Sequence, residues 1–211
     1  MSIQFYLLIV IVCFLAAVVF VCIFGKDIYK EYYSSQLKFD INLDEMKESE
    51  AILKNFLKSN HIDINGNIVQ DVAQKLDVEI GGYSNTIQNN AELSMTNGKK
   101  VVIMKEGLND QEQWFCFAHE CAHLIYGDPI PQTRPEGKDK DKREQKADYL
   151  AAAMIMPWER VNAFLEKNNY MNVSSKKRLK LIDQMCREYN VRDVVVMRRI
   201  KEVIALEQAV S

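Results

Sequence analysis

The stretch that decides the fold is residues 117–123, Phe-Ala-His-Glu-Cys-Ala-His, which contains the pattern His-Glu-x-x-His. On an α-helix, residues four positions apart differ by one turn and about 40° of rotation, so both imidazoles face the same side. Two neutral imidazoles placed in this way can bind Zn²⁺ at about 2.0–2.1 Å. Glu120 lies about 100° round the helix from His119, where it can act on a metal-bound water without binding the metal itself. We therefore expect His119 and His123 to be zinc ligands and Glu120 to be the catalytic base.

The residues around this pattern are almost all apolar, which predicts a buried helix. They are Trp114, Phe115, Phe117, Ala118, Ala122, Leu124 and Ile125. Burying two imidazoles and a carboxylate costs free energy unless these groups are paired or bind a metal. A zinc ion would supply that compensation.

A second expected helix carries Glu144 and Asp148, one turn apart on the same face. A catalytic zinc needs a third protein ligand and an open position for water, and Glu144 can be that ligand. Asp148 can accept the free N–H of a ligating histidine. The alternative for Glu144 is a solvated acidic residue near a helix start. The small residues Ala147, Ala151 and Ala152 would let this helix approach the first one closely.

Hydrophobic periodicity and turn residues predict an α+β domain: a small antiparallel sheet followed by helices. Asn97-Gly98 between two short apolar runs predicts a β-hairpin. The stretch from 128 to 142 is rich in Pro, Gly and charge, which predicts an exposed loop. The expected helices are 44–59, 68–76, 112–126, 142–155, 158–168, 175–189 and 194–207, and the expected strands are 78–83, 91–96 and 101–104.

The N-terminus is apolar and has no charged residue from Ile3 to Phe24. As a helix this run would be about 33 Å long, which matches the hydrocarbon core of a bilayer. It lacks the basic start and small-residue cleavage site of a signal peptide, the alternative interpretation. We therefore expect one transmembrane helix and a membrane-anchored protein, with residues 1–25 as the anchor, 26–43 as a juxtamembrane tether and 44–211 as the metallopeptidase domain.

Flanking lysines suggest which way such an anchor would point. Lys26, Lys30 and Lys38 follow the apolar run, and no basic residue precedes it. By the positive-inside rule, we expect a single-pass protein of the cell membrane with a cytoplasmic catalytic domain. If that orientation is wrong, the chain would be a secreted peptidase.

The overall composition excludes some classes of function. The formal net charge is −2, which argues against direct binding of nucleic acid because phosphate backbones require a basic surface. The five cysteines form no C-x-x-C pair and do not suggest a disulfide framework.

Three segments of the chain resemble the ImmA/IrrE family of zinc metallopeptidases. The first is residues 117–124, Phe-Ala-His-Glu-Cys-Ala-His-Leu; the second runs from Glu144 to Asp148-Tyr149-Leu150-Ala151-Ala152; the third is Ile155-Met156-Pro157. The chain departs from the family pattern at Leu150, where Phe is usual, and at Ile155, and both changes keep an apolar residue. The resemblance covers about residues 65 to 205, so the expected anchor lies outside it.

The resemblance implies a zincin-like helical core and a gluzincin-like site that hydrolyses a peptide bond in a protein. The typical substrate in the family is a helix-turn-helix repressor of a mobile element or stress regulon, so the expected partner is a DNA-binding repressor. In the expected mechanism, zinc activates a bound water and Glu120 transfers its proton to the leaving amine. The alternative function is a non-catalytic, zinc-stabilised module that binds a regulator at the membrane; Glu120 argues against it, because a closed structural site needs no base.

Four further residues remain outside this core set. Tyr126 and Tyr149 are candidate donors to the oxyanion, although packing is the more common role of such tyrosines. His61 is expected to be a turn residue, and Cys116 a small buried hydrophobic residue.

Overall fold

A computed structural model describes residues 41–130 and 138–210 of the chain. In chain order its elements are α2 (Leu43–Ser59), α3 (Ile68–Leu76), β1 (Val78–Ser84), β2 (Ala91–Thr96), β3 (Lys99–Lys105), α4 (Asp110–Tyr126), α5 (Lys138–Ile155), α6 (Trp158–Lys167), η1 (Tyr170–Asn172), α7 (Ser175–Tyr189) and α8 (Asp193–Val210). Two boundaries differ from expectation. α2 begins at Leu43, one residue before the expected start, and is capped by Asn42; α5 begins inside the stretch predicted as a loop.

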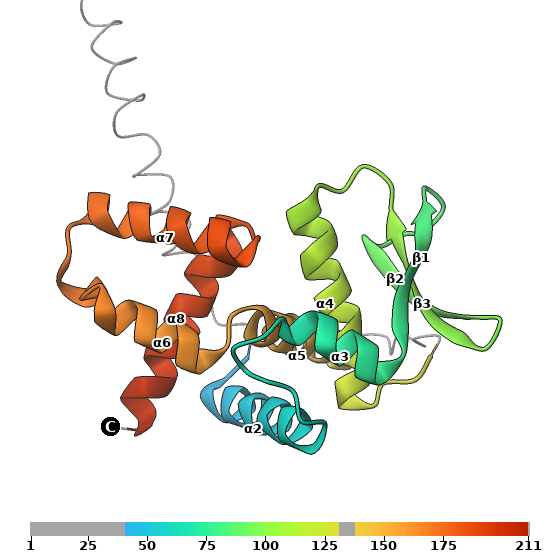
Figure 1. The fold of residues 1–211 in the computed structure, drawn as a ribbon, viewed down its shortest axis with the longest axis horizontal. Helices are drawn as coiled ribbons and strands as arrows, with labels where there is room; N and C mark the ends of the chain where they lie inside the picture. Colours follow the sequence, from blue (N-terminus) through green and yellow to red (C-terminus); the bar gives the residue numbers. More distant parts are fainter. Residues whose placement is uncertain (1–40, 131–137, 211) are drawn as a thin grey trace, which may run out of the picture.

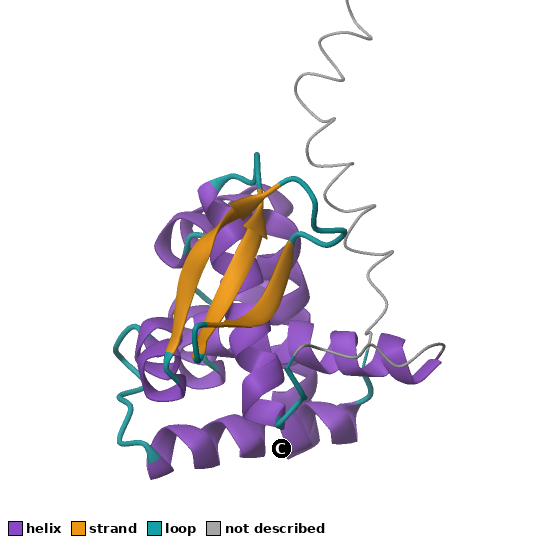
Figure 2. Cartoon of the chain, turned by 90° about the vertical axis from the view of Figure 1, so that its right-hand side faces the viewer, coloured by secondary structure: helices purple, strands orange, loops and turns teal. Residues whose placement is uncertain are grey.

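The three strands form one mixed sheet in the order β1-β3-β2. β2 and β3 are antiparallel and joined by the two-residue turn Asn97-Gly98, as predicted. β1 runs parallel to β3, so the prediction of an antiparallel sheet is wrong for this strand. In Figure 2 the three strands lie side by side in front of the helices.

The apolar content of the strands explains this order. Val101, Val102 and Met104 of β3 are buried, whereas Val78 is the only buried residue of β1. A central strand is covered on both edges, so the most apolar strand gains most from that place. The hairpin therefore inserts β3 beside β1, and the parallel pairing follows from its direction.

Helix α5 occupies the middle of the domain (Figure 1). It contacts α4, α3, α2 and α8, and thereby connects the side that holds the sheet to the side that holds the C-terminal helices. Its residues from Tyr149 to Met154 are at most 1% exposed. Such a central helix can bring side chains from both halves to one site.

The predicted transmembrane helix is not found among the described residues. No helix in residues 41–130 or 138–210 is both long and apolar enough to cross a bilayer. The longest two, α5 and α8, have 18 residues each and carry several charged side chains. The predicted anchor, residues 3–24, lies outside the described residues. On this finding the fold class is corrected to a small mixed sheet with a helical core, and the predicted location, single-pass in the cell membrane with a cytoplasmic catalytic domain, is withdrawn.

Candidate metal centre

Helix α4 places the two histidines of the His-Glu-x-x-His pattern. Its start is fixed by a capping box, in which the Asn109 side chain accepts from the backbone N–H of Glu112, and the Glu112 carboxylate accepts from that of Asn109. The helix ends at Gly127, whose φ of 77° is in the left-handed region that glycine adopts without strain. Between these ends His119 and His123 lie one turn apart, and His123 is buried.

Glu144 of α5 completes a cluster of three potential ligands. The Nε2 atoms of His119 and His123 lie 3.0 Å apart. The Glu144 carboxylate lies 3.3 Å from His119 Nε2 and 3.9 Å from His123 Nε2. The three donor atoms are all within 4.8 Å of one another, close enough for one ion to reach all of them.

Asp148 holds the first histidine from α5. Its Oδ1 atom lies 2.8 Å from His119 Nδ1. Ala147 and Ala151, which flank Asp148 on α5, are fully buried, so small side chains allow the two helices to lie close together. The sequence analysis expected Asp148 to accept from a histidine N–H, and the structure places its carboxylate against His119 Nδ1.

Asp128 holds the second histidine, and the sequence analysis missed it. Its Oδ2 atom lies 2.7 Å from His123 Nδ1, and the neighbouring guanidinium of Arg143 contacts its other oxygen. The turn at Gly127 brings Asp128 back over the helix end, where its backbone N–H donates to His123 O at 3.0 Å. An Asp directly after the Gly that ends the helix could have indicated this contact. The sequence analysis did not consider it, because it assigned Asp128 to an exposed loop.

The two carboxylates fix the tautomers of both histidines. A carboxylate accepts, so each Nδ1 carries the proton and each Nε2 presents a lone pair. Two lone pairs that face each other at 3.0 Å repel unless a proton or a cation lies between them. The donor set of two imidazoles and one carboxylate is one that Zn²⁺ binds in catalytic sites. The residues therefore fit a metal ion.

The pKa values of the two histidines move in opposite directions. Burial lowers the pKa of His119, but hydrogen bonds to Asp148 and Glu144 outweigh it and raise this pKa to about 10. Burial and the charge of His119 lower the pKa of His123, against the opposing effect of Asp128. The two shifts are linked, because positive charge on His119 disfavours positive charge on His123.

A pocket of about 220 Å³ opens beside these groups. Glu120, which is 5% exposed, lies in its wall together with His119, Glu144 and Asp148. The rest of the lining comes from α4, from the segment before β2 and from the first residue of β2: Phe115, Cys116, Asn89, Asn90 and Ala91. A substrate group that enters this pocket would meet the carboxylate of Glu120 and the metal ligands together.

The model of the Peptidase_M78 family, described as the IrrE N-terminal-like domain, matches residues 73–201, which is more than half of the chain. The chain belongs to this family. The matched segment contains both helices of the metal centre, and the family assignment agrees with a peptidase-like domain that has a metal-binding triad.

The other comparisons give less detail. No curated protein shows significant similarity to the chain. Among solved structures, a Mycobacterium tuberculosis transcriptional regulator is similar at 15% sequence identity, with a TM-score of 0.46 over 82% of this chain. The chain spans about half of the length of that regulator.

The tyrosines considered as oxyanion donors in this IrrE-like domain make other hydrogen bonds. Tyr126 donates to Ser49 Oγ at 2.8 Å, and Tyr149 donates to Glu50 Oε1 at 2.7 Å. Neither lines the pocket beside Glu120. His61 is exposed at the end of α2 and is not in the metal-binding group.

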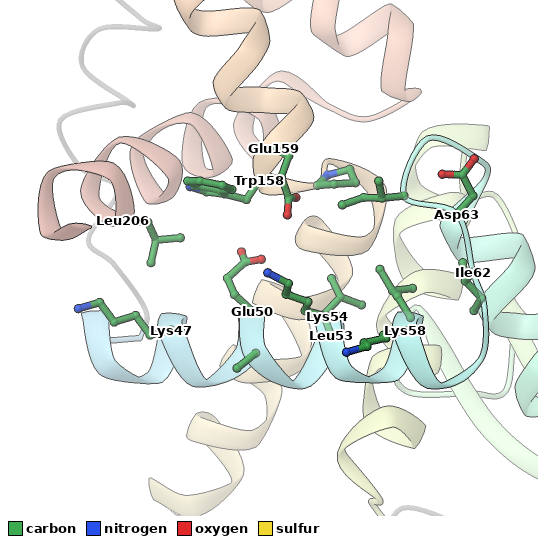
Figure 3. Close-up of a pocket in the computed structure, with 14 residues that line it drawn as sticks. Lys47, Glu50, Leu53, Lys54, Lys58, Ile62, Asp63, Trp158, Glu159 and Leu206 are labelled. Carbon is green, nitrogen blue, oxygen red and sulfur yellow. The ribbon is translucent and has the colours of Figure 1, made fainter. Parts of the chain in front are cut away.

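A larger groove of about 640 Å³ lies away from the metal centre, between α2 and the start of α6 (Figure 3). Its floor is apolar, with Leu53, Leu57 and Trp158, and its rim carries charges of both signs. Most of its lining precedes the segment that matches the family. The metal centre and this groove are therefore separate features.

Proposed function

We propose that the chain is a zinc-dependent metallopeptidase that hydrolyses a peptide bond in a protein substrate. The observation that carries the proposal is the convergence of His119, His123 and Glu144 on one point, with the Glu120 carboxylate in the wall of the same pocket. Membership of a peptidase family supports it. Three protein ligands leave the fourth position of a tetrahedral ion open, as hydrolysis requires.

In this proposal each side chain has a definite role. His119, His123 and Glu144 hold the zinc ion, and Asp148 and Asp128 keep the two imidazoles in the tautomer that presents Nε2. When bound, zinc would lower the pKa of a bound water to about 7 and polarise the scissile carbonyl. Glu120 is placed to accept a proton from the attacking water and to deliver a proton to the leaving amine. Burial of Glu120 keeps its carboxylate out of bulk water and close to the reacting atoms.

The substrate is proposed to be a DNA-binding repressor of the helix-turn-helix class, as in relatives that the chain resembles. The pocket borders Ala91, the first residue of the edge strand β2. An edge strand offers unpaired backbone groups with which an extended segment can form hydrogen bonds. A flexible linker of the repressor, rather than its folded helices, is therefore the expected place of cleavage.

The test is incubation of the purified chain, with zinc, with the helix-turn-helix protein encoded nearest to its gene. We expect zinc-dependent cleavage at one position, mapped by mass spectrometry, and none with Glu120→Gln. A zinc-loaded Glu120→Gln variant that cleaves as fast as the wild type would contradict the assigned role of Glu120. Zinc binding without cleavage of any protein would favour the non-catalytic zinc-stabilised module.

A further inference from the structure

Two arginines contact the carboxylates that are hydrogen-bonded to the histidines. Arg143 contacts Asp128, which faces His123, and Arg198 contacts Asp148, which faces His119. We propose that Arg143 and Arg198 are positioning residues of the metal centre, each acting through one carboxylate on one imidazole. The inference rests on the proposed function insofar as the triad binds zinc.

On the first side, His123, Asp128 and Arg143 form a chain of hydrogen bonds. Asp128 Oδ2 accepts from His123 Nδ1 at 2.7 Å, and Asp128 Oδ1 accepts from Arg143 Nε at 3.1 Å. Arg143 directly precedes Glu144 on α5. It therefore ties the end of α4 to the helix that supplies the third ligand, and fixes His123 relative to Glu144.

On the second side, the arginine that contacts the carboxylate is Arg198 of the C-terminal helix α8. Asp148 Oδ1 accepts from His119 Nδ1 at 2.8 Å, and Asp148 Oδ2 lies 3.8 Å from Arg198 Nη1. Arg198 Nη2 also donates to the backbone carbonyl of Asp148 at 3.5 Å. Helix α8 is distant from α4 in the sequence, yet it reaches the metal centre through this contact.

The shared geometry has a physical consequence. In each case one carboxylate oxygen faces the histidine and the other faces the guanidinium, so the arginine prevents the carboxylate from rotating away. The oxygen that faces each histidine accepts from Nδ1–H, which leaves Nε2 free for a metal. A planar guanidinium holds such an orientation better than an ammonium group.

Arg198 also belongs to a network of ion pairs with Glu202 and Arg199. Its Nε lies 3.7 Å from Glu202 Oε1, and Glu202 Oε2 lies 3.6 Å from Arg199 Nη1. Arg199 donates to Glu50 at 2.7 Å, and Glu50 lies in the wall of the groove in Figure 3. Arg198 is therefore oriented by the buried Glu202 of its own helix, which is in turn held by Arg199.

The test compares Arg143→Met and Arg198→Met with a matched control, Arg160→Met. Arg160 is as exposed as Arg143, at 32% against 34%, and pairs with one carboxylate, Glu188, that touches no histidine. Zinc affinity of the full-length chain is measured by competition with a chromophoric chelator. We expect zinc affinity to fall by about 10-fold in each test variant and to stay unchanged in the control. About 10-fold is the lower end of the loss caused by removing a residue that orients a metal ligand.

Imidazole NMR of the metal-free chain gives a readout independent of zinc. The chain has three histidines, and exposed His61 serves as the reference. Arg198→Met should broaden or shift the Nδ1–H resonance of His119 alone, and Arg143→Met that of His123 alone. If Arg198→Met does not fold, Arg198→Lys keeps the charge and should lose zinc affinity by about threefold. Unchanged imidazole resonances in the folded variants would overturn the proposal.

A double-mutant cycle separates positioning from a general effect on the fold. In an Asp148→Asn background, Arg198→Met should weaken zinc binding by less than about twofold, whereas Arg143→Met should keep its full effect. Additive losses for Arg198 and Asp148 would refute action through the carboxylate. A wild-type chain that binds no zinc would overturn the proposed function as well; a wild type that binds zinc, with arginine variants equal to Arg160→Met, would overturn this inference alone.

Discussion

His119 and His123 face each other through their Nε2 atoms at 3.0 Å, while their Nδ1 atoms are both held by carboxylates. This arrangement directs two lone pairs at one point, beside the carboxylate of Glu144. Electron-pair donor atoms that converge in a buried site are unfavourable unless a proton or a cation lies between them. The relationship is therefore the physical basis for expecting a cation there.

The chain should bind one zinc ion. Metal analysis of the full-length chain should find about one equivalent, and His123→Ala should lose it while His61→Ala keeps it. Because zinc binds the folded state, it should add about 2.7 kcal/mol of stability at a free concentration 100 times Kd, seen as a higher Tm that a chelator reverses. A folded wild type unable to take up zinc would rule out the metal centre.

Glu120→Gln should separate binding from catalysis. The amide cannot accept the proton of water, so peptide-bond hydrolysis should fall by at least about 100-fold, while zinc content stays at the wild-type level because both histidines and Glu144 remain. Cleavage rate and metal content are measured on the same preparation. A loss of zinc in this variant would mean that Glu120 supports the metal rather than the proton transfer.

Asp128→Ala and Asp148→Ala should each weaken zinc binding by about 10- to 100-fold without unfolding the chain, because each frees one imidazole to rotate or change tautomer. Competition with a chelator measures the affinity, and Asp44→Ala, at an exposed position on α2, is the control. If Asp128→Ala binds zinc as tightly as the control, its contact with His123 has no role in the metal centre.

Arg199→Met should destabilise the fold rather than alter the site. Arg199 is fully buried between Glu50 and Glu202, and burial raises the pKa of Glu202. Removing the cation leaves the buried carboxylate of Glu202 and the half-buried carboxylate of Glu50 without it, which costs about 3–5 kcal/mol in the free energy of unfolding. Urea unfolding measures this loss.

The control for that measurement is Arg160→Met, which removes a surface ion pair and should cost no more than about 1 kcal/mol. Changing Glu50 and Glu202 to Gln together with Arg199→Met should recover part of the loss, because no unpaired charge is then buried. An Arg199 variant as stable as the control would show that the buried pair contributes nothing.

Cys116 should be slow to alkylate although it lines the pocket. Burial, followed by the charges of Glu120 and other acidic groups, raises the pKa of Cys116 to about 11. This shift slows the reaction, because the thiolate is the nucleophile. Raising the pKa from 9.0 to about 11 lowers the thiolate fraction at pH 8 by about 100-fold. Iodoacetamide labelling followed by peptide mapping measures the rate in the metal-free chain. Labelling of Cys116 as fast in the folded chain as in urea would contradict this expectation.

The sequence by itself pointed to five candidate residues of the metal centre, although it missed Asp128. His119, His123 and Glu120 follow from the helical period, which is a local property of the chain, and Glu144 with Asp148 repeats the same spacing on the next helix. The hairpin at Asn97-Gly98 was predictable for the same reason, because two residues decide that turn.

Only the tertiary structure decided the rest. The parallel pairing of β1 with β3 depends on which strand is most apolar and takes the centre of the sheet, a comparison among segments rather than within one. Asp128 reaches His123 only because the chain reverses at Gly127, and Arg198 reaches Asp148 only because α8 packs beside α5. Local spacing determines which side chains share a helix face. Contacts between distant segments arise from packing, and packing selects the partners that orient His119 and His123.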